Sequence, residues 1–249
     1  MAGGVLTAST THSYETCPRQ YHYRATDWES ERPSTPRQLR DELLARTMVL
    51  YHMGPAGAPG ALPLAECLAA AAAEMTAAGP AALVQAAVDD LTPLLVDYVR
   101  RVVPRLGPDA RTSPYVLMAD VGPITLVAPL GLTWTEGDGA THSAQWVGPE
   151  TPPARRLLDA AIRRACLRAA GNTSPIHHYA VQVGPRRATL EEIPLDPPLY
   201  RATLGQIWRV WHRMGRDRRW APEPGAHCVA CEFSDRCDAS AAAIGDVPY

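Results

Sequence analysis

Three cysteines stand close together near the end of the chain, and a fourth stands near its start. Cys228, Cys231 and Cys237 follow a C-x2-C-x5-C spacing, and Cys17 lies in a polar N-terminal stretch. Four thiolates form a complete ligand set for an iron–sulfur cluster or a structural zinc ion. If all four bind one site, the first and last segments of the chain must lie side by side. No other feature of the sequence constrains the fold as strongly.

The spacing favours a [4Fe–4S] cluster bound by Cys17, Cys228, Cys231 and Cys237. A zinc ribbon carries two paired C-x2-C motifs, and here only one such pair occurs, so structural zinc is the alternative. Three ordinary surface cysteines without a metal are the simplest alternative. Their density in a reducing compartment, where thiols do not form disulfides, argues against that simplest interpretation.

Composition limits the classes of protein to which this chain can belong. The chain has 249 residues, of which 46% are hydrophobic, so a core can form without metals or disulfides. The formal net charge is −2, which gives no global basic signature of nucleic-acid binding. We find no secretory signal and no stretch as apolar as a membrane span, and we therefore expect a cytoplasmic protein without a membrane partner.

Hydrophobic periodicity predicts a mixed α/β fold. Helices are expected at 36–53, 64–78, 84–102, 152–171 and 197–214, with a Gly/Pro/Ala loop at 54–63. Strands are expected at 115–121, 124–134 and 140–147, with a hairpin at 176–193. This order suggests one domain, 1–249, with a single mixed sheet and a helical insertion. Its segments are an N-terminal turn-rich part (1–35), a helical region (36–110), a central sheet and helix (111–195), and a C-terminal helix with the cysteine run (196–249).

The two ends of the chain resemble a known family. The segment SYETCPRQYHYR at 13–24 and the cysteine spacing are similar to RecB-like nucleases of the PD-(D/E)XK superfamily. One branch, which includes CRISPR-associated exonucleases and the B subunit of AddAB-type helicase–nucleases, holds a [4Fe–4S] cluster on cysteines in these positions. The resemblance implies a RecB-like fold in which an iron–sulfur clasp joins the terminal segments.

The same resemblance implies a catalytic centre that this sequence does not supply. His52 falls where the family has a metal-binding histidine, and the family's acids fall on Gly131 or Leu132 and on Ala144. Trp146 stands at the lysine position, and the chain contains no lysine at all. Arginine is a poor replacement because it stays charged at neutral pH. Binding of Mg²⁺ or Mn²⁺ is therefore doubtful, and the domain is more consistent with an inactive nuclease than with an active one.

A displaced active centre is a second hypothesis, with His52 and Asp120 as its candidate residues. A third hypothesis is an iron–sulfur regulatory protein that senses oxidants. The first remains a catalytically degenerate domain that binds single-stranded DNA or DNA ends, or that serves a helicase or another protein subunit of a DNA-processing complex.

Arginines are the candidate DNA contacts, and tryptophans near the C-terminal ones supply surfaces for base stacking. One group is predicted on the helix at 152–171 and the other in the turn before the cysteines: Arg156, Arg163, Arg164, Arg168, Arg216, Arg218 and Arg219.

Overall fold

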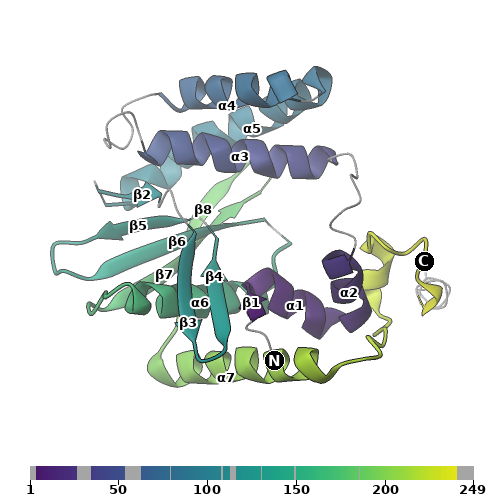
Figure 1. The fold of residues 1–249 in the computed structure, drawn as a ribbon. Helices are drawn as coiled ribbons and strands as arrows, with labels where there is room; N and C mark the ends of the chain where they lie inside the picture. Colours follow the sequence, from purple (N-terminus) through teal and green to yellow (C-terminus); the bar gives the residue numbers. More distant parts are fainter. Residues whose placement is uncertain are drawn as a thin grey trace.

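Figure 1 shows the chain as a computed structural model, with helices and strands labelled in chain order. The structure describes residues 4–26, 35–53, 63–78, 80–107, 109–112, 116–129, 131–148, 150–184 and 186–239. The α-helices are α1 (Ala8–Thr16), α2 (Pro18–Thr26), α3 (Pro36–Met53), α4 (Leu64–Ala78), α5 (Ala81–Arg101), α6 (Pro153–Ala169) and α7 (Pro197–Arg216). The strands are β1 (Gly4–Leu6), β2 (Arg111–Thr112), β3 (Leu117–Val121), β4 (Ile124–Ala128), β5 (Leu132–Thr135), β6 (Thr141–Val147), β7 (Ile176–Val183) and β8 (Ala188–Ile193).

The expected α/β class is confirmed, but the strands form two mixed sheets where one was predicted. A three-stranded sheet has the order β1-β4-β3, and a five-stranded sheet has the order β2-β5-β6-β7-β8. The segment 124–134, predicted as one strand, is divided between the two sheets as β4 and β5. Pro129 follows β4 directly and has no amide hydrogen with which to continue the ladder, so the chain changes sheet at this point.

Each sheet combines parallel and antiparallel pairs. In the larger sheet β6 runs parallel to β7, and its other pairs are antiparallel. In the smaller sheet β1 is parallel to β4, and β3 is antiparallel to it. The parallel β6–β7 connection runs through α6, as a crossover between parallel strands requires.

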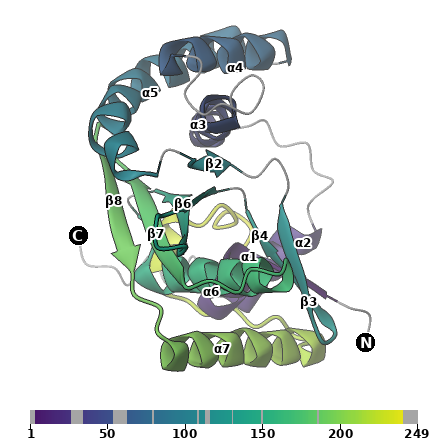
Figure 2. The ribbon, with the colours of Figure 1, turned by 90° about the vertical axis from the view of Figure 1, so that its left-hand side faces the viewer.

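Helices cover both faces of the sheets (Figures 1 and 2). The predicted helical insertion exists as α3, α4 and α5, which pack over one face of the five-stranded sheet. Their shared core includes Leu43, Leu91 and Tyr98 from the helices together with Leu132 and Val181 from the sheet. Helix α6 lies on the opposite side, and α7 packs beneath α6 at the surface of the molecule.

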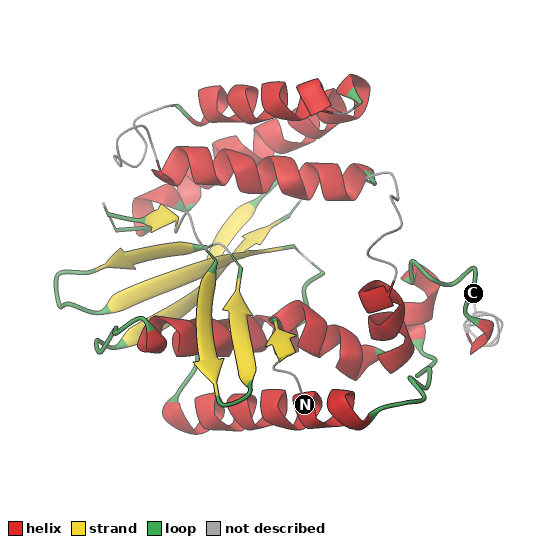
Figure 3. Cartoon of the chain, viewed as in Figure 1, coloured by secondary structure: helices red, strands yellow, loops and turns green. Residues whose placement is uncertain are grey.

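The N-terminal segment, predicted to be turn-rich, contains a short strand and two helices (Figure 3). Thr7 caps α1 by accepting a hydrogen bond from the amide of Thr10, whose hydroxyl in turn accepts one from the Thr7 amide. Such reciprocal capping satisfies two amides that a helix start leaves without partners. The threonine pair is a weaker signal than the usual glutamate version, so the prediction missed this helix. The loop predicted at 54–63 lies outside the described residues except for Pro63.

The two ends of the chain do lie side by side, as the cysteine pattern required. We call the contact between α1–α2 and residues 217–238 the terminal junction. Trp220 is its centre: its ring stacks on His22 with centroids 5.0 Å apart and meets Tyr14 edge-on at 6.0 Å. Ion pairs join Arg19 to Asp238 at 2.9 Å and Arg24 to Glu232.

Asp217 holds the backbone of this junction in an unusual conformation. Trp220 has φ of +47°, in the left-handed region that costs a non-glycine residue about 1–2 kcal/mol. The Asp217 carboxylate accepts hydrogen bonds from the Arg219 and Trp220 amides at 3.0 and 2.9 Å, and from the Tyr14 hydroxyl at 3.0 Å. These contacts offset the cost of the strained backbone.

Across the described residues, no helix combines the length and the apolar composition that a membrane crossing demands.

We expect Asp217→Ala to destabilise the protein by about 1–2 kcal/mol, because two backbone amides and one hydroxyl lose their acceptor. The hydrogen bond from the Trp220 amide is the largest of the effects that lower the pKa of Asp217 below its ordinary value. The stabilisation is therefore present above about pH 4 and is lost as the pH falls through that lowered pKa. Urea unfolding at several pH values measures it. Asp235→Ala, at an exposed carboxylate, is the control, and equal losses in both variants would contradict the assignment.

Candidate functional site

The structure brings the four predicted cysteines to one place. Cys17, Cys228, Cys231 and Cys237 all line a small cavity inside the terminal junction. Cys17 and Cys228 are buried, whereas Cys231 and Cys237 are partly exposed. Burial raises the pKa of the Cys231 thiol, and the neighbouring cysteines raise it further.

The predicted cofactor is nevertheless contradicted. In the part of the chain that the structure describes, no group of three or more His, Cys, Asp or Glu side chains is arranged to hold a metal ion. The cavity among the cysteines has a volume of about 20 Å³, which is room for about one water molecule. The ligand arrangement contradicts both the [4Fe–4S] cluster and the zinc alternative, and the cavity is also too small for a cluster. The hypothesis of an iron–sulfur sensor loses its basis. Aromatic stacking and ion pairs hold the terminal junction instead.

The positions that the resemblance assigned to catalysis meet on one face of the five-stranded sheet. A hydrogen bond of 2.7 Å joins Nε2 of His52, at the end of α3, to the Tyr98 hydroxyl. Its ring centroid lies 6.3 Å from that of Trp146 on β6. Leu132 and Ala144 are direct partners across β5 and β6, and both are fully buried. These side chains belong to the apolar core under α3 and α5.

Burial makes the side chains of this cluster chemically unreactive. His52 is 3% exposed, and desolvation lowers its pKa to about 4, so the ring is neutral at physiological pH. Asp120 lies elsewhere, on β3, where it accepts a 2.7 Å hydrogen bond from the Thr125 hydroxyl at the surface. The two candidates of the displaced centre therefore lie on different elements with different partners.

Gly131, the other position expected for an acid, has no room for a side chain. A Cβ atom there lies 2.5 Å from the Ala144 carbonyl oxygen and 2.7 Å from Nη2 of Arg163. Arg163 comes from α6, is 2% exposed and donates from Nη2 to the Pro129 carbonyl at 2.7 Å. A buried guanidinium thus occupies the space beside β5 that an acidic side chain at 131 needs.

The arginines of α6 do not form an open basic face. Besides Arg163, Arg156 donates to the Thr151 carbonyl and pairs with Glu191, and Arg164 donates to the Leu195 carbonyl. Arg168 is exposed and donates to the Asn172 carbonyl at the end of its own helix. Most of these guanidinium groups fasten α6 to its surroundings.

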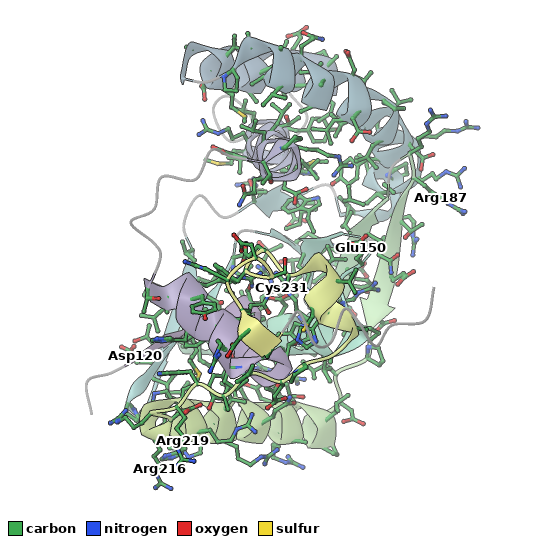
Figure 4. All side chains as sticks on the ribbon, turned by 90° about the vertical axis from the view of Figure 1, so that its right-hand side faces the viewer. Asp120, Glu150, Arg187, Arg216, Arg219 and Cys231 are labelled. Carbon is green, nitrogen blue, oxygen red and sulfur yellow. The ribbon has the colours of Figure 1, made fainter. Side chains whose placement is uncertain are left out.

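The arginines around α7 point to solvent. Asp196 caps this helix by accepting from the Leu199 amide, and two prolines follow it in the first turn. The inner face buries Thr203, Ile207, Val210 and Trp211. We call the outer face, together with the turn that follows it, the α7 basic face; its exposed arginines are Arg201, Arg209, Arg213, Arg216, Arg218 and Arg219. Figure 4 shows Arg216, the last residue of α7, and Arg219, in the turn after it, at the edge of the molecule.

Arg201 and Arg209 were not among the predicted contacts. Their signal was present in the sequence: residues 197–216 contain no acidic residue. The apolar residues of the same helix indicate packing, and they mask this signal. Trp208, which is 38% exposed, lies on the same helix between Arg201 and Arg209.

A groove with a volume of about 1000 Å³ lies between α3 and the sheets. Asp159 of α6 lines it, and desolvation raises the pKa of this carboxyl to about 6, although Arg155 and Arg163 act in the opposite direction. Among the described residues, the Asp159 carboxylate makes no hydrogen bond or ion pair.

No family model and no curated protein matches the chain. Among solved structures, the crystal structure of SSO0001 is similar with a TM-score of 0.40 and 14% sequence identity, over 95% of this chain and 86% of that one. A likeness this weak carries no argument about function.

We expect Gly131→Ala to destabilise the protein by about 2–3 kcal/mol, because the new methyl group overlaps a backbone carbonyl and a buried guanidinium. Gly137→Ala is the matched control, since no atom lies within 4 Å of a Cβ at that position. Denaturant unfolding compares the two variants. Similar stabilities would show that Arg163 moves aside at little cost.

We expect Asp159→Asn to flatten the dependence of stability on pH. The raised pKa means that ionised Asp159 opposes folding, so the wild type loses stability as the pH rises from about 4 through 6, on the order of 1–2 kcal/mol. The amide variant escapes this loss. Unfolding at pH 4.5 and 7.5 tests it, with Asp89→Asn, at an exposed position of α5, as control. An unchanged pH profile in Asp159→Asn would contradict the assignment.

Proposed function

We propose that this chain is a noncatalytic nucleic-acid-binding domain on a scaffold of the PD-(D/E)XK type, acting as an accessory part of a DNA-processing complex. The α7 basic face carries the proposal. Residues 197–220 contain six arginines and one acid, Asp217, which gives a local charge of 6 − 1 = +5 in a protein whose formal net charge is −2.

This charge is available for phosphate. Within the described part of the chain, no ion pair neutralises any of the six arginines. Arg213 lies 5.4 Å from the centre of the Tyr14 ring, and Arg218 contacts only the carbonyls of Gly215 and Asp217. Guanidinium groups are strong phosphate ligands because their planar fork donates two parallel hydrogen bonds. A row of them on one exposed helix fits a polyanion.

Trp208 favours a single strand over a duplex. Trp208 is 38% exposed and lies between Arg201 and Arg209 along the helix, with the Trp211 ring centroid 5.3 Å from its own. Unpaired bases stack on exposed aromatic rings, whereas the bases of a duplex are already stacked on one another. A basic helix with an exposed tryptophan is therefore suited to the backbone and bases of single-stranded DNA.

Two observations support the absence of hydrolysis. The chain has no lysine. The positions that correspond to the family's catalytic residues are occupied by Leu132, Ala144 and Trp146, which pack with a neutral His52 in the core. Nothing at that place is able to activate a water molecule. We therefore expect no cleavage of single-stranded DNA with Mg²⁺ or Mn²⁺.

The test is fluorescence anisotropy with a labelled oligothymidylate at several salt concentrations. We expect Arg209→Gln combined with Arg216→Gln to weaken binding at least tenfold at 50 mM salt. The slope of log Kd against log salt should fall by about 1.4, because each lost phosphate contact on a single strand contributes about 0.7. Trp208→Ala should weaken binding with little change in this slope.

Arg186→Gln combined with Arg187→Gln is the matched control. It removes the same charge from the β7–β8 hairpin, and Figure 4 places Arg187 on the side of the molecule opposite Arg216 and Arg219. Equal weakening in both double variants would reduce the effect to net charge and contradict a defined site on α7. Cleavage of the oligonucleotide by the wild type would overturn the noncatalytic part.

A further inference from the structure

The groove between α3 and the sheets lies away from α7 and has its own chemistry. Its lining begins at Thr7 and Ser9 at the start of α1 and includes the C-terminal end of β6 and the β7–β8 hairpin. Its volume of about 1000 Å³ is at the upper end of the range for ligand sites in proteins. Thus it offers room for a chain of several residues and not only for a small molecule.

Polar atoms without partners lie along this groove. Gln145 is 4% exposed and donates from Nε2 to the Arg156 carbonyl at 3.2 Å, but its Oε1 has no partner among the described residues. The same holds for Nε1 of Trp146 and Nε of Arg155. All three residues line the groove. These three atoms are buried beneath the wall of the groove, and a buried polar atom without a partner favours a side-chain rearrangement that gives it one.

Charge narrows the choice of ligand. Four carboxylates and two guanidinium groups line the groove, which gives a formal charge of −4 + 2 = −2: Asp41, Asp90, Glu150, Asp159, Arg40 and Arg155. Arg40 is already paired with Asp90 and lies 3.4 Å from Asp41. This balance repels a phosphate backbone and attracts a cation. The groove and the α7 basic face therefore suit opposite kinds of partner.

Apolar side chains complete the walls. Ala45 and Val49 come from α3, Val127 from β4 and Val183 from β7. Val116, just before β3, is 49% exposed at the margin. A ligand that fills the groove must therefore present apolar groups beside its positive ones.

We propose that this groove binds an extended segment of a partner protein in which basic and apolar side chains alternate. Its basic side chains donate to the carboxylates of Asp41 and Asp159, and its apolar side chains pack on Val49, Val127 and Val183. Charge complementarity selects this occupant.

The probe is a blocked, fluorescein-labelled hexapeptide of alternating valine and arginine, with the valine–glutamate hexapeptide as its counterpart. We expect saturable binding of the basic peptide and none of the acidic one. Asp41→Asn combined with Asp159→Asn should raise the Kd at least tenfold. Asp89→Asn combined with Glu66→Gln removes the same charge from exposed sites outside the groove and should leave the Kd within twofold.

An NMR signal separates binding in the groove from general attraction. The indole ¹H–¹⁵N peak of Trp146, identified by its loss in Trp146→Phe, should shift as the basic peptide is added. The peak of buried Trp134, which does not line the groove, should stay in place.

Three results would overturn the proposal: no binding of the basic peptide at 1 mM, equal binding of the acidic peptide, or equal effects of the two double variants. A dimer in sedimentation that Asp41→Asn with Asp159→Asn abolishes would assign the groove to a second copy of this chain instead. Oligonucleotide binding through α7 is measured separately, so either proposal can fail without the other.

Discussion

The burial of α6 between the two sheets is the constraint on which the rest of the structure depends. Leu158 and Ile162 of this helix pack with Ile124 and Leu126 of the smaller sheet, while its other contacts reach β6, β7 and β8 of the larger one. Ile207 of α7 joins the same core from below. Because a sheet must cover its apolar face, one helix that serves both sheets fixes their relative position. The position of α6 therefore also determines where the groove and the α7 basic face lie.

Arg163 illustrates the energetic cost of burying α6. A fully buried guanidinium loses its hydration, and desolvation lowers the pKa of this group. The Pro129 carbonyl and the nearby Asp159 compensate for part of that loss. The same arginine fills the space beside Gly131, so the place where the resemblance puts an acid is occupied by a positive charge. Replacement of single residues at 131 or 144 is therefore insufficient to rebuild a metal centre, because Arg163 and the packed core around Trp146 stand in the way.

The net charge of the chain conceals two surfaces of opposite sign. The α7 basic face concentrates arginines on an exposed helix with an apolar inner side, whereas the groove gathers carboxylates from α3, α5 and α6. This separation is the basis of the two proposals, a polyanion on the α7 basic face and a cationic segment in the groove. In the proposed accessory role, the two surfaces link a nucleic acid to a protein without catalysis.

Much of the secondary structure was predictable, because helix periodicity in 36–53, 64–78 and 84–102 and the hairpin at 176–193 depend on local spacing. The cysteine spacing also predicted that the two ends of the chain meet, although the shared metal site behind that prediction is contradicted. The absence of lysine is read directly from the sequence. Only the tertiary structure decided the rest. Division of 124–134 between two sheets depends on which partners each half finds, and capping of α1 depends on a weak local signal. The state of the cysteines depends on side-chain geometry, which spacing cannot specify. Burial separates the fastened arginines of α6 from the exposed ones of α7, since a guanidinium binds phosphate only where the fold leaves it in solvent.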